Sequence, residues 1–237
     1  MEKKINGGEL GMIIIRQNPR ERRFSLRIKE GQIIATMPYR GDERKMLSFI
    51  EEHRENLLHI LRKNPKRPLL DEQTELQTYT FRLHLFRSPR TNFYMTLKEG
   101  VLHIACPEQT DFKDKQTQEI LGRLLKDALR HEAKRILPNR LKELAERHRF
   151  SYEKVAIRDT ESRWGSCSMQ KHISLSLSLM LLPEHLIDYV LLHELCHTLE
   201  MNHSERFWLL MNRVTDGNAQ KFRREMKHYQ MLPNCGG

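Results

Sequence analysis

The sequence contains few cysteines, and no two of them have the spacing of a metal site. Only four occur among 237 residues (Cys106, Cys167, Cys196 and Cys235), and none forms a C-x-x-C motif. Disulfide frameworks and cysteine-based zinc modules both need closely spaced cysteines, so these classes are excluded. We expect reduced thiols and a cytoplasmic protein.

Long apolar runs are also absent. A transmembrane helix needs about 20 predominantly apolar residues, and no segment approaches this length. The first ten residues, M-E-K-K-I-N-G-G-E-L, contain no apolar signal core. We therefore expect neither a membrane span nor a secretory leader.

Two signatures of phosphate chemistry are missing as well. The sequence has no Gly-rich phosphate loop and no acidic cluster of the kind that holds Mg²⁺. These absences count against nucleotide hydrolysis, although metal-activated water can attack phosphorus.

Positive charge, by contrast, is abundant. Lysine and arginine total 41 against 31 acidic residues, which gives a net charge of +10. A basic surface favours an anionic partner such as a nucleotide or nucleic acid, but a solvated surface without any partner is equally common. Alternation along strands would divide the candidate N-terminal patch between two faces (Arg16, Arg20, Arg22, Arg23, Arg27 and Lys29).

An internal repeat organises the first half of the chain. Residues 24–38 read F-S-L-R-I-K-E-G-Q-I-I-A-T-M-P, and residues 93–107 read F-Y-M-T-L-K-E-G-V-L-H-I-A-C-P. Each segment predicts two strands around a Gly turn, preceded by another strand (12–16 and 79–86) and followed by a helix. We expect two β-meander-plus-helix units, related either by duplication or only by similar turn chemistry.

Helical periodicity predicts helices over about 42–63 and 114–137, the second broken by Pro138, with a further helix to about 149. Residues 64–76, with two prolines, predict a linker, and strands are expected at 152–158 and 171–179. We expect an N-terminal β-rich region at 1–110 and a catalytic domain at 111–237.

Residues 193–203 read H-E-L-C-H-T-L-E-M-N-H and carry the strongest functional signal. Two histidines four residues apart lie on one face of a helix, so His193 and His197 can reach one metal ion. Glu194 lies about 100° round the helix, where a carboxylate can act as general base without ligating the metal. The pattern predicts a catalytic metal site, with Zn²⁺ or another divalent ion.

A third ligand could come from His203 or from Glu200. If the helix continued, Glu200 would lie on the face of the two histidines, one turn further on. For His203 to ligate, the helix must end and turn back. Asn202 can adopt the left-handed conformation that ends helices, and Ser204 is a good N-cap for a following helix. We favour His203.

Two simpler interpretations of the motif remain. The helix is apolar almost all round, so its histidines could be core residues hydrogen-bonded to Glu194. Alternatively, a purely structural metal could bind there, although such sites usually have four protein ligands. Cys196, between the two histidines, is expected in the core because no base accompanies it.

A second motif, R-W-G-S-C-S at 163–168, precedes this helix. Gly165 permits an unusual backbone or a close approach by a ligand. The simple interpretation is a hairpin with Trp164 in the core, whereas a functional one makes this strand an edge to which an extended substrate adds. Arg163 is the first candidate for stabilising a developing oxyanion, ahead of Tyr229 and His228.

These segments, with N-H-S-E-R-F-W at 202–208, resemble the YgjP-like metallopeptidases, also described as metal-dependent hydrolases. The likeness extends to the Arg-rich first strand and to the hairpin ending at Pro38, although about 64–110 departs from the shortest members. The histidine spacing equals that of metzincins, but Glu200 stands where metzincins have glycine, and no Met-turn is evident.

The resemblance implies an α+β fold with a zincin-like core, in which the active-site helix lies beside a small mixed sheet. It also implies His193, His197 and His203 as metal ligands and Glu194 as catalytic base. The expected function is a zinc-dependent metallopeptidase acting on a peptide or protein. The alternatives are a nucleoside triphosphate pyrophosphatase and a nucleic-acid-associated protease of SprT-like type.

Overall fold

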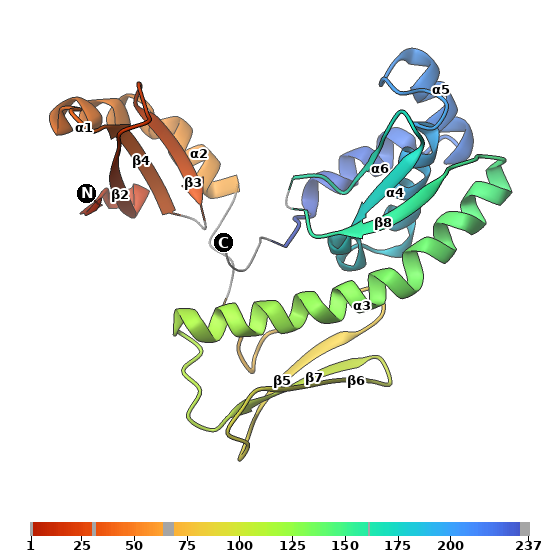
Figure 1. Ribbon diagram of the computed structural model, residues 1–237, viewed down its shortest axis with the longest axis horizontal. Coiled ribbons are helices and arrows are strands. Elements are labelled where there is room, and N and C mark those ends of the chain that lie inside the picture. Colours follow the sequence, from red (N-terminus) through yellow and green to blue (C-terminus); the bar gives the residue numbers. More distant parts are fainter. Residues whose placement is uncertain (1, 30–31, 64–68, 161, 233–237) are drawn as a thin grey trace. The chain divides into compact units, whose positions relative to one another are not determined.

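The chain folds into two compact units, Met1–Pro68 and Leu69–Gly237. The computed structural model describes residues 2–29, 32–63, 69–160 and 162–232. The predicted linker at 64–76 begins with five residues outside this range and continues, from Leu69, inside the second unit. Figure 1 shows the chain coloured by sequence.

The first unit is a four-stranded sheet with two helices. The strands are β1 (Glu2–Asn6), β2 (Met12–Asn18), β3 (Ser25–Lys29) and β4 (Gln32–Pro38), in the order β1-β2-β4-β3. A 3₁₀ turn (Gly8–Leu10) joins the first two strands. The helices are α1 (Glu43–Glu52) and α2 (Arg54–Lys63), so the predicted helix at 42–63 is interrupted at His53. Asp42 caps α1 by accepting a hydrogen bond from the Arg44 backbone N–H at 2.8 Å.

The predicted β-meander is wrong in one respect. Strand β4 pairs antiparallel with β3 but parallel with β2, so it lies between them. Both inner strands of the sheet, β2 and β4, carry apolar residues into the core, among them Ile33, Ala35 and Met37 of β4. The turn residues 30–31 lie outside the described range.

The repeat is borne out by strand pairing. In the second unit, β5 (Arg82–Ser88), β6 (Tyr94–Lys98) and β7 (Val101–Pro107) form a sheet of order β5-β7-β6, again with the last strand central and parallel to the first. The registers correspond residue for residue: Ser25 faces Thr36 as Tyr94 faces Ala105. The chain therefore contains the same three-stranded module twice.

The boundary between the units lies at residue 68 rather than at the predicted 110. The second copy of the module packs on α3 (Lys115–His148), and its inward-facing leucines belong to the same core as those of the helix. This shared apolar surface holds the sheet in the catalytic half of the chain (Leu83, Leu85, Leu102, Ile104, Leu121, Leu125, Leu129).

Helix α3 is continuous, so the predicted break at Pro138 is wrong. A proline inside a helix costs about 3 kcal/mol because it removes a hydrogen bond and clashes with the preceding turn. Leu137 and Leu141 flank it and are fully buried, and each contributes about 1.5–3 kcal/mol of burial. Their packing offsets the cost of the proline.

The rest of the second unit surrounds one buried helix. A mixed sheet of order β8-β10-β9 comprises β8 (Lys154–Arg158), β9 (Gly165–Cys167) and β10 (His172–Ser176). The predicted strand at 171–179 ends at Ser176, whose hydroxyl accepts from the Ser178 N–H and starts a 3₁₀ turn (Leu177–Leu181). Then follow α4 (Glu184–Cys196), α5 (Glu205–Val214), α6 (Ala219–Glu225) and a last 3₁₀ turn (Met226–His228). The protein is thus an α+β protein with small sheets.

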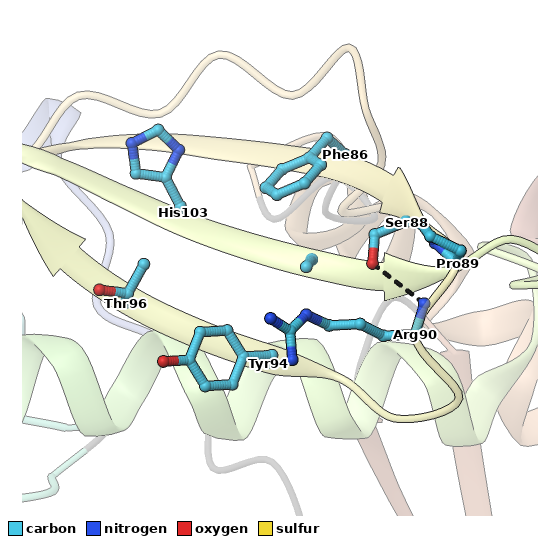
Figure 2. Close-up of a pocket in the computed structure, with 8 residues that line it drawn as sticks. Phe86, Ser88, Pro89, Arg90, Tyr94, Thr96 and His103 are labelled. Atoms are coloured by element: carbon cyan, nitrogen blue, oxygen red, sulfur yellow. Dashed lines mark hydrogen bonds between the residues drawn. The ribbon is translucent and has the colours of Figure 1, made fainter.

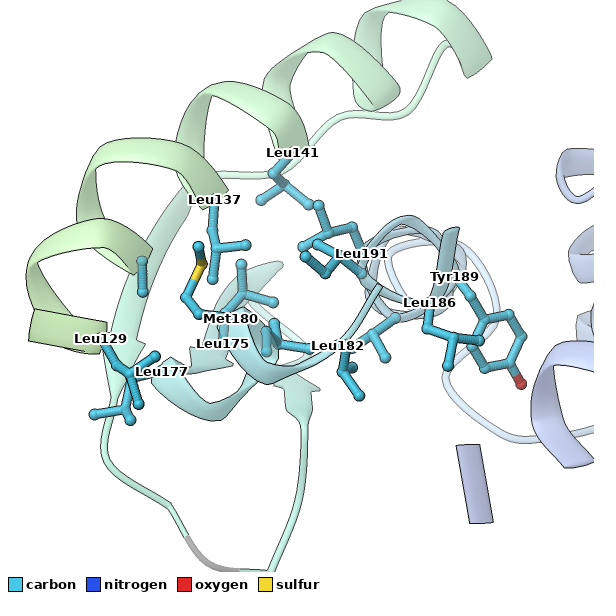
Figure 3. Packing of buried hydrophobic residues seen from close by; sticks show 14 of the residues in the cluster. Leu129, Leu137, Leu141, Leu175, Leu177, Met180, Leu182, Leu186, Tyr189 and Leu191 are labelled. Atoms are coloured by element: carbon cyan, nitrogen blue, oxygen red, sulfur yellow. The ribbon is translucent and has the colours of Figure 1, made fainter. Parts of the chain in front are cut away.

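Helix α4 is fixed against α3 by apolar and ionic contacts. Figure 3 shows leucines of both helices, among them Leu137, Leu141, Leu186 and Leu191, in one packed cluster. Arg140 of α3 donates two hydrogen bonds, of 2.7 and 2.6 Å, to the carboxylate of Asp188 in α4. Two parallel hydrogen bonds fix the orientation of the guanidinium and the carboxylate, so they restrict both the spacing and the relative orientation of the two helices. Among the described residues, no helix is long and apolar enough to cross a membrane.

The packing between α3 and α4 gives a stability prediction. We expect Leu141→Ala to lower the free energy of unfolding by about 2–5 kcal/mol, because it leaves a cavity at a fully buried position. The adjacent Lys142→Ala removes only an exposed side chain, and its effect should stay within about 0.5 kcal/mol. Urea unfolding followed by circular dichroism measures both, and similar midpoints for the two variants would contradict the packing described.

Candidate metal centre

Helix α4 presents His193 and Glu194 from its last turn, and His197 caps its end. Pro183 precedes the helix at its N-cap position, as its fixed backbone angle favours. The helix is apolar on nearly all sides and buried, so the polar residues of its last turn enter a largely dry environment. They must therefore be satisfied by one another or by a ligand.

The chain then returns toward the helix, as His203 requires. Helix α4 ends at Cys196, and Ser204 caps α5 by accepting a hydrogen bond from the Phe207 N–H. The predicted left-handed conformation of Asn202 is not observed, since the described non-glycine residues with positive φ lie elsewhere. Instead, the Asn202 carbonyl accepts from the Ser204 N–H at 2.7 Å, which makes the turn tight.

The three histidines converge on one point. The Nε2 atom of His193 lies 3.2 Å from that of His197 and 3.0 Å from that of His203. The three ligand atoms all lie within 4.8 Å of one another. Tetrahedral Zn–N bonds of about 2.0–2.1 Å would place nitrogens roughly 3.4 Å apart, close to this arrangement. The donor set therefore fits a single divalent ion.

The protonation of these imidazoles suits metal binding. Burial, together with the charges of the two neighbouring histidines, lowers the pKa of His193 to about 3. Burial also lowers the pKa of His197. Both rings therefore remain uncharged at neutral pH, and an uncharged imidazole is the form that ligates metals.

Glu200 contributes through its backbone and not through its carboxylate. Its carbonyl accepts a hydrogen bond from Nδ1 of His197 at 3.0 Å, which leaves Nε2 of that ring free as the lone-pair nitrogen. The carboxylate of Glu200 is not part of the three-residue cluster. Because α4 ends at Cys196, His203 lies in the cluster with His193 and His197, and the Glu200 carboxylate does not.

An aromatic floor, absent from the sequence prediction, supports the three imidazoles. Phe207 is fully buried, and its ring centroid lies 4.7–4.9 Å from those of the three histidines. Trp208 stacks on His203 at 6.0 Å, and the guanidinium of Arg223 lies 4.8 Å above the indole ring. The only sequence signal was an aromatic pair at the start of the helix after the last histidine.

Glu194 is buried, and one of its oxygens lacks a partner. The side chain sits beside the histidine cluster, and Oε2 has no hydrogen-bond partner among the described residues. Burial raises the pKa of Glu194 to about 8, while the positive charge of Arg163 opposes this shift. A cation bound at the histidine nitrogens would also lower the pKa of Glu194, as the charge of Arg163 does.

Gly165 makes room for Glu194. A Cβ atom at Gly165 would lie 2.7 Å from both Cγ and Oε1 of Glu194, closer than any normal contact. Glycine therefore lets strand β9 approach the carboxylate of α4. The sequence suggested a close approach by a ligand at Gly165, whereas the group that approaches it in the structure is the side chain of Glu194.

Comparison with known proteins identifies the family. Residues 22–229 match the YgjP-like family, metallopeptidase domain. The chain belongs to the YgjP-like metallopeptidase family. Membership makes it a metal-dependent hydrolase of the peptidase class, as the sequence motifs predicted.

Among solved structures, the chain is similar to a metallopeptidase zymogen, abylysin of Pyrococcus abyssi. The match has 24% identity and a TM-score of 0.36, and it covers 41% of this chain and all of the other. No curated protein matches.

The other candidate residues of this YgjP-like protein differ in their exposure to solvent. Arg163 is exposed, and its backbone carbonyl accepts from the Thr160 hydroxyl at 2.9 Å. Tyr229 packs against the core and His228 is exposed. Cys196 is fully buried, and burial raises the pKa of its thiol to about 12, which confirms it as a core residue.

The arginines of the candidate N-terminal patch lie on two strands and on the loop between them. Arg16 forms a 2.9 Å ion pair with Glu2, and Arg20, Arg22 and Arg23 lie in the loop after β2. Arg27 lies on β3, and pairing across the sheet places it on the same face as Arg16, so the two are not divided between faces.

The contact between β9 and Glu194 gives a prediction about activity. We expect Gly165→Ala to displace the Glu194 carboxylate and to lower the peptidase rate by about 10²-fold, because small displacements of a reacting group are costly. Metal content should be unchanged, since the alanine does not touch the histidines. Lys142→Ala, an alanine substitution at an exposed position of α3 that does not touch Glu194, is the control. Full activity of Gly165→Ala would mean that Glu194 is not confined there.

Proposed function

We propose that this protein is a zinc-dependent peptidase with a zincin-like active site. In this proposal His193, His197 and His203 hold the metal ion, and Glu194 is the general base. The observation that supports it most is the convergence of three imidazole nitrogens beside a buried carboxylate with an unpartnered oxygen. Three histidine ligands leave one coordination position open, as catalytic zinc sites do.

The protein's own groups divide the chemistry between them. A bound zinc ion would supply Lewis acidity, which acidifies water and polarises a carbonyl. Glu194 accepts a proton from the attacking water through its free Oε2 and returns it to the leaving amine. The buried setting of Glu194 raises its proton affinity, and Arg163 moderates this effect.

The substrate is proposed to bind along β9. This strand lies at the edge of the sheet β8-β10-β9, and its residue Gly165 contacts Glu194. An extended peptide can add to such an edge through main-chain hydrogen bonds, which would bring a peptide bond next to the carboxylate. Arg163, exposed at the start of this strand, is the proposed donor to the developing oxyanion.

Metal analysis tests the ligands. We expect one equivalent of zinc in the wild-type protein and near-complete loss in His203→Ala, because two remaining histidines bind zinc weakly. Glu200→Ala provides the matched control: it removes the alternative carboxylate but keeps the carbonyl that orients His197, so zinc should be retained. Measurement is by inductively coupled plasma mass spectrometry after dialysis. Zinc retained in His203→Ala and lost in Glu200→Ala would reverse the assignment.

Substitution of the base tests the reaction. We expect Glu194→Gln to lower peptide hydrolysis by about 10²–10⁴-fold with zinc retained, because proton transfer is lost while the histidines stay in place. Glu184→Gln, at an exposed position of the same helix, should leave the rate unchanged. The panel comprises casein, extended peptides and nucleoside triphosphates.

One outcome of this panel would contradict the peptidase proposal and favour a phosphoanhydride hydrolase. It is turnover of nucleoside triphosphates that Glu194→Gln abolishes, together with no cleavage of any peptide in the panel.

A further inference from the structure

The second copy of the three-stranded module has an open face. Residues alternate along its strands, so Leu83 and Leu85 of β5 pack toward α3 while His84 and Phe86 point the other way. Figure 2 shows Phe86, Tyr94, Thr96 and His103 on this second face, with Arg90 beside them. They line a hollow of ≈ 600 Å³ on the side of the sheet away from α3.

Rings occupy all three strands of this face. His84 stacks on Phe86 with centroids 5.3 Å apart, and His103 lies edge-on to both, at 5.3 and 6.4 Å. Tyr94 is 51% exposed, and the guanidinium of Arg90 lies 4.7 Å above its ring. Flat, accessible rings on a rigid sheet therefore stand next to a positive charge.

The charge that lines the hollow is positive. The residues lining the hollow include Arg90 but no carboxylate. Arg82, two positions before His84 on β5, adds positive charge to the same side of the sheet, whereas the charge of Lys98 is paired with Glu99 at 3.5 Å. An anionic ligand is favoured by such a surface.

The first copy of the module shows that the rings are not required by the fold. Register places Ser25, Ile34 and Ile14 where the second copy has Tyr94, His103 and His84. The buried faces of the two copies are alike, with Ile33 and Ala35 corresponding to Leu102 and Ile104. The two copies thus share an apolar core face, whereas the open face is aliphatic and polar in the first copy and aromatic in the second.

We propose that this aromatic face binds single-stranded nucleic acid. Bases stack on exposed aromatic rings whatever their sequence, and arginine and lysine contact the phosphates. This face offers rings for base stacking on neighbouring strands and arginine for contacts with the phosphates. The site is separate from the metal centre and goes beyond the proposed peptidase reaction.

Binding of labelled oligonucleotides to the full chain tests this site. The probes are oligothymidylate and oligouridylate of about 12 nucleotides, long enough for a site of this kind, followed by fluorescence anisotropy over a range of salt. We expect binding that weakens with salt, about 10-fold weaker in Tyr94→Ala and unchanged in Tyr94→Phe, because the ring and not the hydroxyl stacks. The two probes distinguish DNA from RNA.

Charge controls complete the experiment. Arg90→Ala should weaken binding and reduce the salt dependence by about one counterion, whereas Arg27→Ala, on the open face of the first module, removes the same charge and should have little effect. Melting curves and zinc content establish that each variant is folded.

Three results would overturn the proposal: no binding by the wild-type protein, equal binding by wild type and Tyr94→Ala, or equal losses in Arg90→Ala and Arg27→Ala. Preferential binding of an acidic peptide to this face would replace nucleic acid with a protein partner. Peptidase activity is unaffected in every case, so the two proposals fail independently.

Discussion

Three imidazole rings, those of the half-buried His193, the buried His197 and the exposed His203, are held together beside the buried Glu194 at the end of α4, and the rest of the second unit can be understood from that requirement. The Nε2 atoms of His193, His197 and His203 lie about as close to one another as nitrogens on one metal ion. Uncharged rings have little attraction for one another at this distance, so the surrounding structure must hold them. The burial that lowers the pKa of His193 also raises that of Glu194, so both residues are shifted toward their neutral forms.

Each neighbouring element supplies one constraint on this cluster. Helix α3 fixes the axis of α4 through packed leucines and the pair of Arg140 with Asp188. The carbonyl of Glu200 orients His197, and Phe207 supports all three rings from below. Strand β9 lies against the side chain of Glu194, which is possible only because residue 165 has no side chain. Several independent contacts thus fix the positions of the site residues, and a reactive site needs such support to hold its groups in the productive geometry.

The module that occurs twice shows how one fold can carry different surfaces. Both copies keep an apolar face against helices and place the last strand in the centre of the sheet. Their opposite faces share neither charge pattern nor ring content. Core positions are limited by packing, whereas the open face is free to acquire a ligand. In the second copy, β6 and β7 are joined by a two-residue turn, Glu99 and Gly100. Both residues have the positive φ that such a turn requires.

The sequence by itself determined the site residues as candidates, because metal chemistry restricts both residue type and spacing. It also predicted the repeated pattern of strands, the cap at Ser204 and the likeness to a peptidase family. It did not determine that Pro138 lies inside a continuous helix, that β4 and β7 insert between their partners, or that the second module joins the catalytic half. Only the tertiary structure decided these, and with them the contact between Gly165 and Glu194 and the aromatic floor at Phe207. The physical reason is range: caps and helical ligand spacing depend on residues within about one turn, whereas strand order and burial depend on apolar surfaces that meet across the whole unit.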